Sequence, residues 1–577
     1  MSNLNGAQVL VKCLEKQGVE YVFGHPGGAA INIFDALLDS KIKFILTRHE
    51  QGATHMADGY ARASGKLGVV LVTSGPGALN TVTGIATARM DSVPILVISG
   101  QTNKGNLGKD AFQESDVFGV TMPLVKHSYL ILESSDIPRV IKEAHHIATT
   151  GRPGPVLIDL PKDVSNEDTE LDLEAKMDLP GYVVHDKSPS LSLDQKGRVQ
   201  ELARHLMASK KPLLLIGHGA LIAGASSEIR HLAETLGAPV TNTLLGKGAF
   251  PESHPLSLGM LGMHGTAYAN YALTECDLIL SIGSRFDDRI NGNNEEFCRG
   301  AKKLHIDIDQ AEINKIVQVD AAVCGDAKLV LKELSQYLEP LKTAPWLSQL
   351  ADYRRENPLL TGGGDGLTAA SVIKGIYEKS KDFARTIVTT DVGQHQMWAA
   401  QHFLTDDPDC FLSSGGAGTM GFGFPSAIGA QLAKKDSLVI TFCGDGGFQM
   451  TLCELATAVV HRLPLKIVVL DNACLGMVRQ WQELFYDERY SGIDLEGNPD
   501  FASLAESYGM KAFVLEKESQ IATVLEAALS YDAGPCLIHA KINRKENVFP
   551  MIPAGKSAKD IVLRAPTVKL EKPIGST

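Results

Sequence analysis

Short apolar runs rich in β-branched residues recur along the chain, and most of them end at glycine or proline. Between positions 19 and 98 such runs occupy 21–23, 44–46, 69–73 and 95–98, and the segments between them have helical periodicity. Strands that alternate with helices predict an α/β fold with a doubly wound parallel sheet. The pattern returns with strands at 212–216 and 278–282, and once more between 368 and 540.

Polar, proline-bearing stretches separate these regions, so we predict three doubly wound domains. The expected domains are 1–165, 195–340 and 368–545, with linkers at 166–194 and 341–367 and a basic tail at 546–577. A chain of 577 residues suits several cores, because a domain averages about 150 residues. Segments 69–99 and 438–470 share one pattern of strand, Gly-x-Gly turn, helix and strand, so domains one and three look related, by duplication or by convergence.

Composition excludes several classes of protein. Apolar residues make up 44% and charged residues 21%, as in ordinary globular enzymes, and the net charge of −12 gives no global attraction for nucleic acid or anionic lipid. No apolar stretch approaches the ~20 residues of a membrane span, and the first residues lack a secretory pattern. The nine cysteines form no C-x-x-C pair. We therefore expect a cytoplasmic protein without a disulfide framework.

The third region carries the most specific chemistry. Gly444-Asp445-Gly446 follows an apolar strand and precedes a helix, where backbone N–H groups suit a diphosphate. Asn472 lies 27 positions later, at the end of the next strand. Because parallel strands end at one sheet edge, the Asp445 carboxylate and the Asn472 amide oxygen can meet on one Mg²⁺ ion. A tight turn with a helix-capping Asp is the simpler alternative.

This spacing resembles the thiamine diphosphate (ThDP) enzymes, whose motif is GDG followed at similar distance by Asn-Asn. Here Asp471 replaces the first Asn, and the third family ligand would be the Cys474 carbonyl oxygen. The family also needs a buried glutamate against the aminopyrimidine ring. Glu50, which follows the strand at 44–46 and opens a helix, fits that role; alternatively, it only stabilises the helix N-terminus.

Longer matches narrow the resemblance to the catalytic subunits of acetohydroxyacid synthases. They include FGHPGGA, TSGPG, DAFQE, GRPGPVLIDLPKDV, LGMLGMHG, GSRFDDR, SGGAGTMGFGFP and GMVRQWQ. In that family the middle domain holds FAD without net redox change. One difference is Asn103, where the family commonly has proline, so the shape of the access channel is not implied.

The resemblance assigns roles residue by residue. It implies ThDP contacts from Pro26, Glu50, Gly75, Gln394, His395, Gly418, Met420, Gly444, Asp445, Gly446, Gly447, Asn472, Leu475, Gly476 and Met477. It implies FAD contacts from Arg152, Gly217, Gly219, Thr243, Leu244, Met263, His264, Gly265, Gly283, Arg285, Asp287, Arg289, Asp307, Ile308 and Asp326. Substrate contacts would come from Phe112, Gln113, Lys162, Arg289, Met477 and Trp481, and the catalytic residues would be Glu50, Gly27, Gln113 and Lys162.

The implied reaction is decarboxylation of pyruvate and transfer of the remaining two-carbon unit to a second pyruvate or to 2-oxobutanoate. The products are 2-acetolactate and 2-aceto-2-hydroxybutanoate, early intermediates of branched-chain amino-acid synthesis. The resemblance implies at least a homodimer, and it leaves a tetramer and a small regulatory subunit open. The alternatives are a 2-oxoacid decarboxylase or flavin-dependent oxidase of the same superfamily, a nicotinamide or flavin dehydrogenase, and a non-catalytic scaffold.

Overall fold

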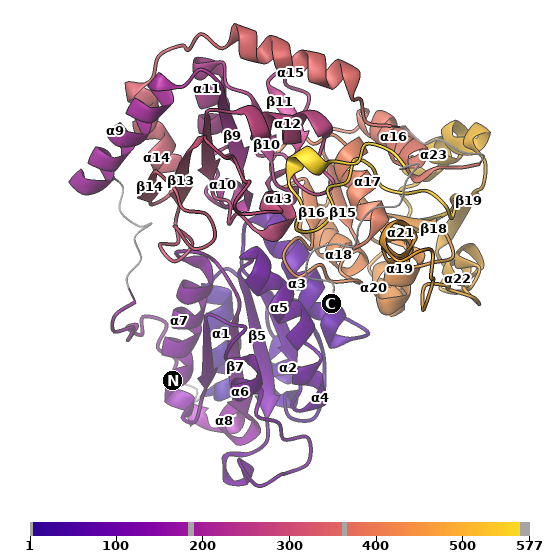
Figure 1. Cartoon of the computed structure of the whole chain (residues 1–577). Helices are drawn as coiled ribbons and strands as arrows, with labels where there is room; N and C mark the ends of the chain where they lie inside the picture. The colour runs from indigo at the N-terminus through magenta and orange to yellow at the C-terminus, as the bar shows by residue number, and fades with distance from the viewer. Residues whose placement is uncertain (1–3, 183–189, 361–365, 566–577) are drawn as a thin grey trace.

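Three parallel six-stranded sheets form the framework of the computed structural model, which describes residues 4–182, 190–360 and 366–565 (Figure 1). The predicted α/β class with three doubly wound sheets is therefore confirmed. Among the described residues, no helix is both long enough and apolar enough to cross a membrane.

The first sheet has the order β3-β2-β4-β5-β7-β6. Its strands are β2 (Tyr21–His25), β3 (Lys43–Leu46), β4 (Gly68–Val72), β5 (Ile95–Gln101), β6 (His127–Leu130) and β7 (Val156–Pro161). The helices around it are α1 (Gly6–Lys16), α2 (Ile31–Leu37), α3 (Glu50–Ser64), α4 (Pro76–Leu79), α5 (Val82–Asp91), α6 (Val117–Thr121), α7 (Ile137–Thr149) and α8 (Lys162–Asn166).

The third sheet, β16-β15-β17-β18-β20-β19, repeats that order when its strands are numbered along the chain. Its strands are β15 (Thr386–Thr390), β16 (Phe411–Ser413), β17 (Leu438–Gly444), β18 (Lys466–Asp471), β19 (Lys511–Leu515) and β20 (Cys536–Lys541). Its helices are α16 (Ala369–Ser380), α17 (Gln394–His402), α18 (Gly423–Ala433), α19 (Asp445–Thr451), α20 (Leu455–Val460), α21 (Gly476–Phe485), α22 (Phe501–Ser507) and α23 (Ile521–Leu529). The shared topology supports the relation between domains one and three that their sequences indicate.

The middle sheet has a different order, β11-β10-β9-β12-β13-β14, that of dinucleotide-binding folds. Its strands are β9 (Pro212–Ile216), β10 (Val240–Asn242), β11 (Ser257–Met260), β12 (Leu278–Ile282), β13 (Lys302–Asp307) and β14 (Ala321–Cys324). Its helices are α9 (Leu193–Ala208), α10 (His218–Ile222), α11 (Ser226–Leu236), α12 (Ala267–Glu275), α13 (Asp288–Asn291) and α14 (Ala327–Leu334).

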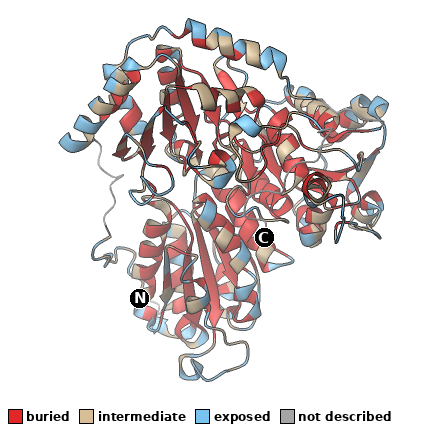
Figure 2. Ribbon diagram, in the orientation of Figure 1, coloured by how far each residue is buried: buried red, intermediate tan, exposed pale blue. Residues whose placement is uncertain are grey.

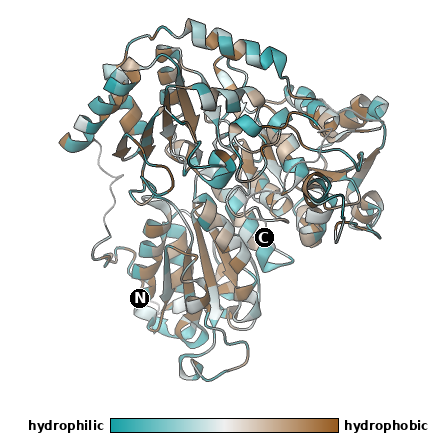
Figure 3. Cartoon of the chain, in the orientation of Figure 1, coloured by the Kyte–Doolittle hydropathy of each residue, from teal (hydrophilic) through white to brown (hydrophobic). Residues whose placement is uncertain are grey.

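The inner strands of each sheet are buried in the core. Figure 2 shows the strands as buried, and Figure 3 shows them as the most hydrophobic elements, because parallel sheets are covered on both faces. One core cluster joins the first and third domains, since α3 and α18 pack against each other between the two sheets. This contact fixes how the two domains sit relative to each other.

Two segments expected as linkers are partly structured. Within 341–367, α15 (Ala344–Glu356) packs on the middle domain: Trp346 is 2% exposed, and its Nε1 donates to the Pro212 carbonyl at 3.1 Å. Within 166–194, β8 (Asp168–Thr169) pairs antiparallel with β1 (Leu4–Asn5). The polar composition of these two segments did not indicate the contacts, because a few apolar side chains are enough to anchor a short segment. In the expected tail, Val548 and Met551 are fully buried.

Candidate active site

The predicted residues of the first domain gather at one edge of its sheet. Pro26 and Gly27 follow β2, Glu50 follows β3, Gly75 follows β4 and Lys162 follows β7. All these strands are parallel, so their carboxyl ends lie on the same side. This is the edge at which open α/β sheets bind ligands.

Glu50 is a buried carboxylate that its neighbours hold in place. It opens α3 and is 8% exposed, and its Oε2 accepts a hydrogen bond from Asn80 Nδ2 at 2.9 Å. The N–H groups of Arg48 and His49 donate to the carboxylate of Glu454, in the third domain, at 3.0–3.1 Å. The start of α3 is thus fixed against the third domain, and Glu50 is restricted in where it can point.

Close backbone contacts shape the loops beside Glu50. A Cβ on Gly27 would lie 2.6 Å from the Thr73 side chain. Gly75 has a φ of +59°, and a Cβ there would lie 2.7 Å from the Gln113 carbonyl oxygen. Gln113 is therefore next to the turn after β4, whereas Phe112 is 89% exposed and Lys162 is exposed as well. Neither Phe112 nor Lys162 lines the large cavity described below.

The structure brings the predicted residues of the third domain together at the matching sheet edge. A Cβ on Gly444 would lie 2.8 Å from His395 Nδ1, and one on Gly476 would lie 2.1 Å from Gln394 Oε1 and 2.7 Å from Asn472 Nδ2. These glycines allow the backbone to approach the side chains closely.

Three more predicted residues meet at Gly446. A Cβ there would lie 2.8 Å from Leu475 Cδ2 and 3.6 Å from Met420 Cε. The Oε1 of Gln394 and the Nε2 of His395, which open α17, are buried and have no hydrogen-bond partner. Such orphaned polar atoms call for a ligand or water.

Asp445 and Asp471 form a carboxylate pair at this edge. Asp445 is 2% exposed and accepts from Asn498 Nδ2 at 2.9 Å, and burial together with the Asp471 carboxylate raises the pKa of Asp445. Burial also acts on Asp471, but hydrogen bonds from His539 Nε2 at 2.8 Å and from the Ala473 N–H hold its pKa below the ordinary value. A cation beside Asp445 would relieve the cost of its buried charge.

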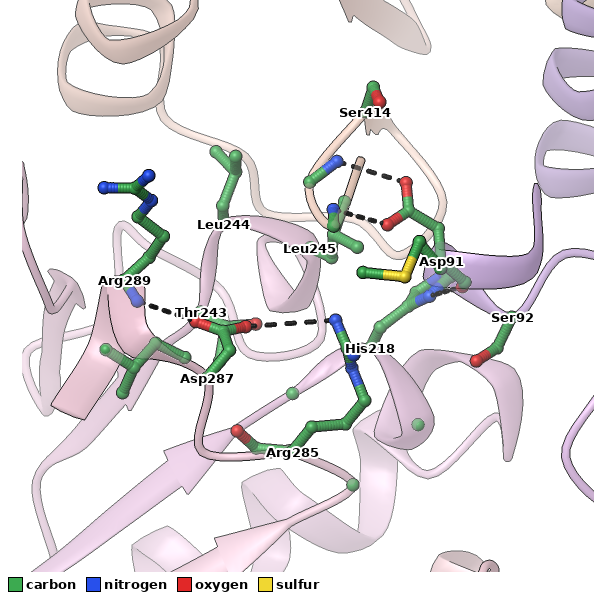
Figure 4. Close-up of a pocket in the computed structure, with 18 of the residues that line it drawn as sticks. Asp91, Ser92, His218, Thr243, Leu244, Leu245, Arg285, Asp287, Arg289 and Ser414 are labelled. Carbon is green, nitrogen blue, oxygen red and sulfur yellow. Dashed lines mark hydrogen bonds and ion pairs between the residues drawn. The ribbon is translucent and has the colours of Figure 1, made fainter. Parts of the chain in front are cut away.

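A cavity of about 810 Å³ lies between the three domains (Figure 4). Its walls come from the ends of α5 and α7, from loops after strands of the middle sheet, and from 414–418 and α21 of the third domain. The predicted FAD residues that line it are Arg152, Gly217, Gly219, Thr243, Leu244, Met263, His264, Gly283, Arg285, Asp287, Arg289, Asp307, Ile308 and Asp326. Gly418, Met477 and Trp481 line it too, so it adjoins the third-domain edge, whereas Gly265 does not line it.

Charged and polar groups converge on this cavity. Arg152 Nη1 donates to Glu312 at 2.6 Å and to Asp309 at 3.2 Å, which ties the first domain to the middle one. Burial lowers the pKa of His218 and of His264 to about 4, so both rings are neutral at pH 7. The buried Nδ1 of His264 and Oγ of Ser284 have no hydrogen-bond partner. The cavity thus offers unsatisfied polar groups to a large, partly polar ligand.

Comparison with known proteins gives a consistent result over the whole chain. Three domains of the thiamine pyrophosphate enzymes match: the N-terminal TPP binding domain at 4–120, the central domain at 199–334 and the C-terminal TPP binding domain at 391–540. A probable acetolactate synthase large subunit of Methanocaldococcus jannaschii is 47% identical over 97% of this chain and 95% of its own length.

Two further relatives agree. The acetolactate synthase large subunit of Parasynechococcus marenigrum is 46% identical over 97% of this chain and 91% of its own length. The acetolactate synthase large subunit of Haemophilus influenzae is 43% identical over 98% of this chain and 99% of its own length. The chain belongs to the acetolactate synthase family of thiamine pyrophosphate enzymes.

For a thiamine pyrophosphate enzyme, the arrangement of the two sheet edges matters most. Among the described residues, Glu50 makes no hydrogen bond or ion pair with Asp445 or Asn472, and none of the three lines the large cavity.

Asp91 is a residue of the site that the sequence patterns did not indicate. It ends α5, lines the cavity and binds groups of all three domains. No local signal marks it, because its partners come from distant positions.

Proposed function

We propose that the chain condenses two molecules of pyruvate to 2-acetolactate with loss of CO₂, and that it also uses 2-oxobutanoate as acceptor. The observation that carries this proposal is the likeness to acetolactate synthases along nearly the full length of both chains. The implied cofactors are ThDP, Mg²⁺ and FAD.

The third-domain edge fits a magnesium-bound diphosphate. Asp445, Asn472 and the Cys474 carbonyl would hold Mg²⁺, and Gly444, Gly446 and Gly447 with Gln394 and His395 would surround the diphosphate. The orphaned buried atoms of Gln394 and His395 and the raised pKa of Asp445 support this fit. The described residues contain no cluster of three His, Cys, Asp or Glu side chains for a metal, in line with a site that uses one carboxylate and neutral oxygens.

The large cavity fits FAD. Loops after β9 and β12 meet there without side chains, since a Cβ on Gly217 would lie 2.2 Å from the Gly283 carbonyl oxygen. Arg285 would face the flavin's phosphates, Arg289 would contact both the flavin and the substrate, and Asp307 and Asp326 would face the flavin's hydroxyl groups. The orphaned Ser284 and His264 atoms support a polar occupant.

When bound, ThDP supplies an electron sink for decarboxylation. The chain's own residues then have distinct tasks. Glu50 would hold or give up a proton beside the aminopyrimidine ring, which Pro26, Gly75 and Met420 would position. Lys162, Gln113 and Arg289 would bind substrate carboxylates, Gly27 would keep the backbone close to the reacting atoms, and Met477 and Trp481 would contact the alkyl end of the acceptor.

We propose at least a homodimer, in which Glu50 of one subunit serves the diphosphate edge of another. The resemblance to acetohydroxyacid synthases, which implies at least a homodimer, supports this arrangement. Mixing inactive Glu50→Gln subunits with inactive Asp445→Ala subunits should restore part of the activity, because each mixed dimer contains one intact site. No recovery in a mixture shown to exchange subunits would argue against shared sites.

All three relatives reported above are named large subunits, so we propose that a small regulatory subunit binds this chain as well. We also propose a cytoplasmic location, in line with nine unpaired cysteines. Copurification of the chain from its native source would test the small subunit, and fractionation of the source cells would test the location.

The decisive experiment is product identification. The purified protein is incubated with pyruvate, ThDP and Mg²⁺, with and without FAD, and the products are identified by NMR. We expect 2-acetolactate, with 2-aceto-2-hydroxybutanoate once 2-oxobutanoate is added. Acetaldehyde alone would indicate a simple decarboxylase, and acetate with peroxide would indicate an oxidase; either result would overturn the proposal.

A further inference from the structure

Asp91 is a buried carboxylate that the reaction does not use. It is the last residue of α5, and its side chain is fully buried. Its Oδ2 forms an ion pair with Arg62 Nη2 at 2.9 Å, and Arg62 also binds Asp58 at 2.6 Å. A buried ion pair is weak evidence for a stabilising role, so its other contacts decide what it does.

The carboxylate also binds the loop between β16 and α18. The N–H of Gly415 donates to Asp91 Oδ2 at 3.1 Å, and the N–H of Gly416 donates to Oδ1 at 2.7 Å (Figure 4). Arg62 Nη1 donates to the Ser413 carbonyl at 3.1 Å. The first domain therefore binds this segment's N–H groups through Asp91 and the carbonyl oxygen at its start through Arg62.

That loop is a wall of the large cavity. Residues 414–418 line it, and a Cβ on Gly416 would lie 2.8 Å from Met90 Cβ and 3.2 Å from Arg285 Nη2. Met420 lies two residues beyond the loop, and its Cε would lie 3.6 Å from a Cβ on Gly446 of the third-domain sheet edge. A shift of the loop would change both the cavity and the position of Met420.

The backbone of Asp91 reaches the middle domain. Its carbonyl oxygen accepts from His218 Nδ1 at 2.8 Å, which fixes the proton of this neutral ring on Nδ1. His218 opens α10, between Gly217 and Gly219 of the expected flavin site. One residue thus joins three of the elements that enclose the cavity.

We propose that Asp91 is a positioning residue for the flavin site. Its carboxylate sets the 414–418 loop and its carbonyl sets His218, so the first domain positions the parts of the site that the other two domains supply. The inference rests on the proposed function, because that proposal places FAD in the cavity.

Variants of Asp91 test the proposal against a matched control. Asp91→Ala removes both loop contacts, and Asp91→Asn keeps one acceptor. Glu143→Gln is the control: Glu143 is equally buried in the first domain, where it accepts from the Arg139 and Tyr129 side chains and from the Asp178 backbone N–H, and it lies outside the cavity. All three variants are compared with the wild type in FAD affinity, flavin absorbance spectrum and thermal stability.

We expect Asp91→Ala to weaken FAD binding by at least ~10-fold, which corresponds to about 1.4 kcal/mol, with Asp91→Asn in between. Glu143→Gln should bind FAD as the wild type does even where it loses comparable stability. Wild-type affinity and spectrum in a folded Asp91→Ala protein would overturn the proposal.

Hydrogen exchange without flavin separates this inference from the proposed function. In the wild type, the amides of Gly415 and Gly416 should exchange slowly, and Asp91→Ala should accelerate them by at least ~10-fold while Glu143→Gln does not. Rapid exchange of the Gly415 and Gly416 amides in the wild type would show that Asp91 does not hold this loop. It would refute the proposal even if neither Asp91 variant folds. A wild type that binds no FAD would instead refute the flavin proposal, and the exchange result would still decide the role of Asp91.

Discussion

Replacing Gly429 by alanine tests the contact that orients the two cofactor domains. Gly429 lies in α18 where this helix crosses α3, and an added Cβ would lie 1.9 Å from the Met56 carbonyl oxygen and 2.7 Å from the Tyr60 N–H nitrogen. Real Cβ atoms stay at least 3.0 Å from such atoms, so the helices must separate by about 1.1 Å. Both neighbouring atoms are backbone, which leaves no side chain to rotate away.

The expected cost follows from two opposing effects. Overpacking a rigid contact costs typically ~1–3 kcal/mol, and alanine recovers up to about 1 kcal/mol of helix propensity over glycine. Because backbone meets backbone, we place the overpacking cost at its upper end and expect a net loss of about 2 kcal/mol. A displacement of ~1 Å at the helix that begins with Glu50 should also lower turnover by up to ~10²-fold.

Gly197→Ala is the matched control. Gly197 is exposed in the middle of α9, and nothing lies within 4 Å of its added Cβ. The same substitution should therefore stabilise the protein by ~0.5–1 kcal/mol and leave turnover unchanged. Urea unfolding midpoints and steady-state rates are measured for both variants. Equal stability of Gly429→Ala and the wild type, or similar losses in both variants, would refute the packing argument.

Three further predictions concern Asp391, Asp445 and Trp481. Burial raises the pKa of Asp391 to about 7. The ionised form is therefore disfavoured in the folded state, and stability falls as pH rises from about 4 through 7. Relative to Asp391→Asn, the wild type should lose about 2 kcal/mol in urea unfolding between pH 5.5 and 8.5, and a constant difference would contradict this. Asp445→Ala should abolish Mg²⁺-dependent ThDP binding in calorimetry, so unchanged affinity would count against the metal site. Trp481→Leu should shift competition from 2-oxobutanoate toward pyruvate by ~10-fold, since one methylene contact is worth ~1–3 kcal/mol, and an unchanged product ratio would remove Trp481 from acceptor selection.

Periodicity and turn residues were sufficient to predict the three parallel sheets. The expected strand at 69–73 is β4 (Gly68–Val72), and that at 212–216 is β9 (Pro212–Ile216). Apolar runs bounded by glycine and proline are strong local signals, so these elements could be found without tertiary information. The helix α15 within an expected linker was missed, because its burial depends on two side chains, Trp346 and Leu350.

The candidate site was predictable where residues lie close in sequence to a strand end. Asp445 and Asn472 follow neighbouring strands of a parallel sheet, so their spacing alone places them at one edge. Asp91 was not predictable, since its hydrogen bonds reach positions 62, 218, 415 and 416 and exist only once all three domains have packed. The enclosing shape of the large cavity likewise depends on domain packing.

The central claim is that Glu50 of the first domain and the Mg²⁺ edge of the third serve the same ThDP molecule. Exchange of the cofactor's C2 proton with solvent, measured by NMR in the Mg²⁺-loaded protein, tests it most directly. The account predicts that Glu50→Gln slows this exchange by at least ~10²-fold while ThDP affinity stays within a few-fold of the wild type. Exchange at the wild-type rate in a fully loaded Glu50→Gln protein would contradict the account.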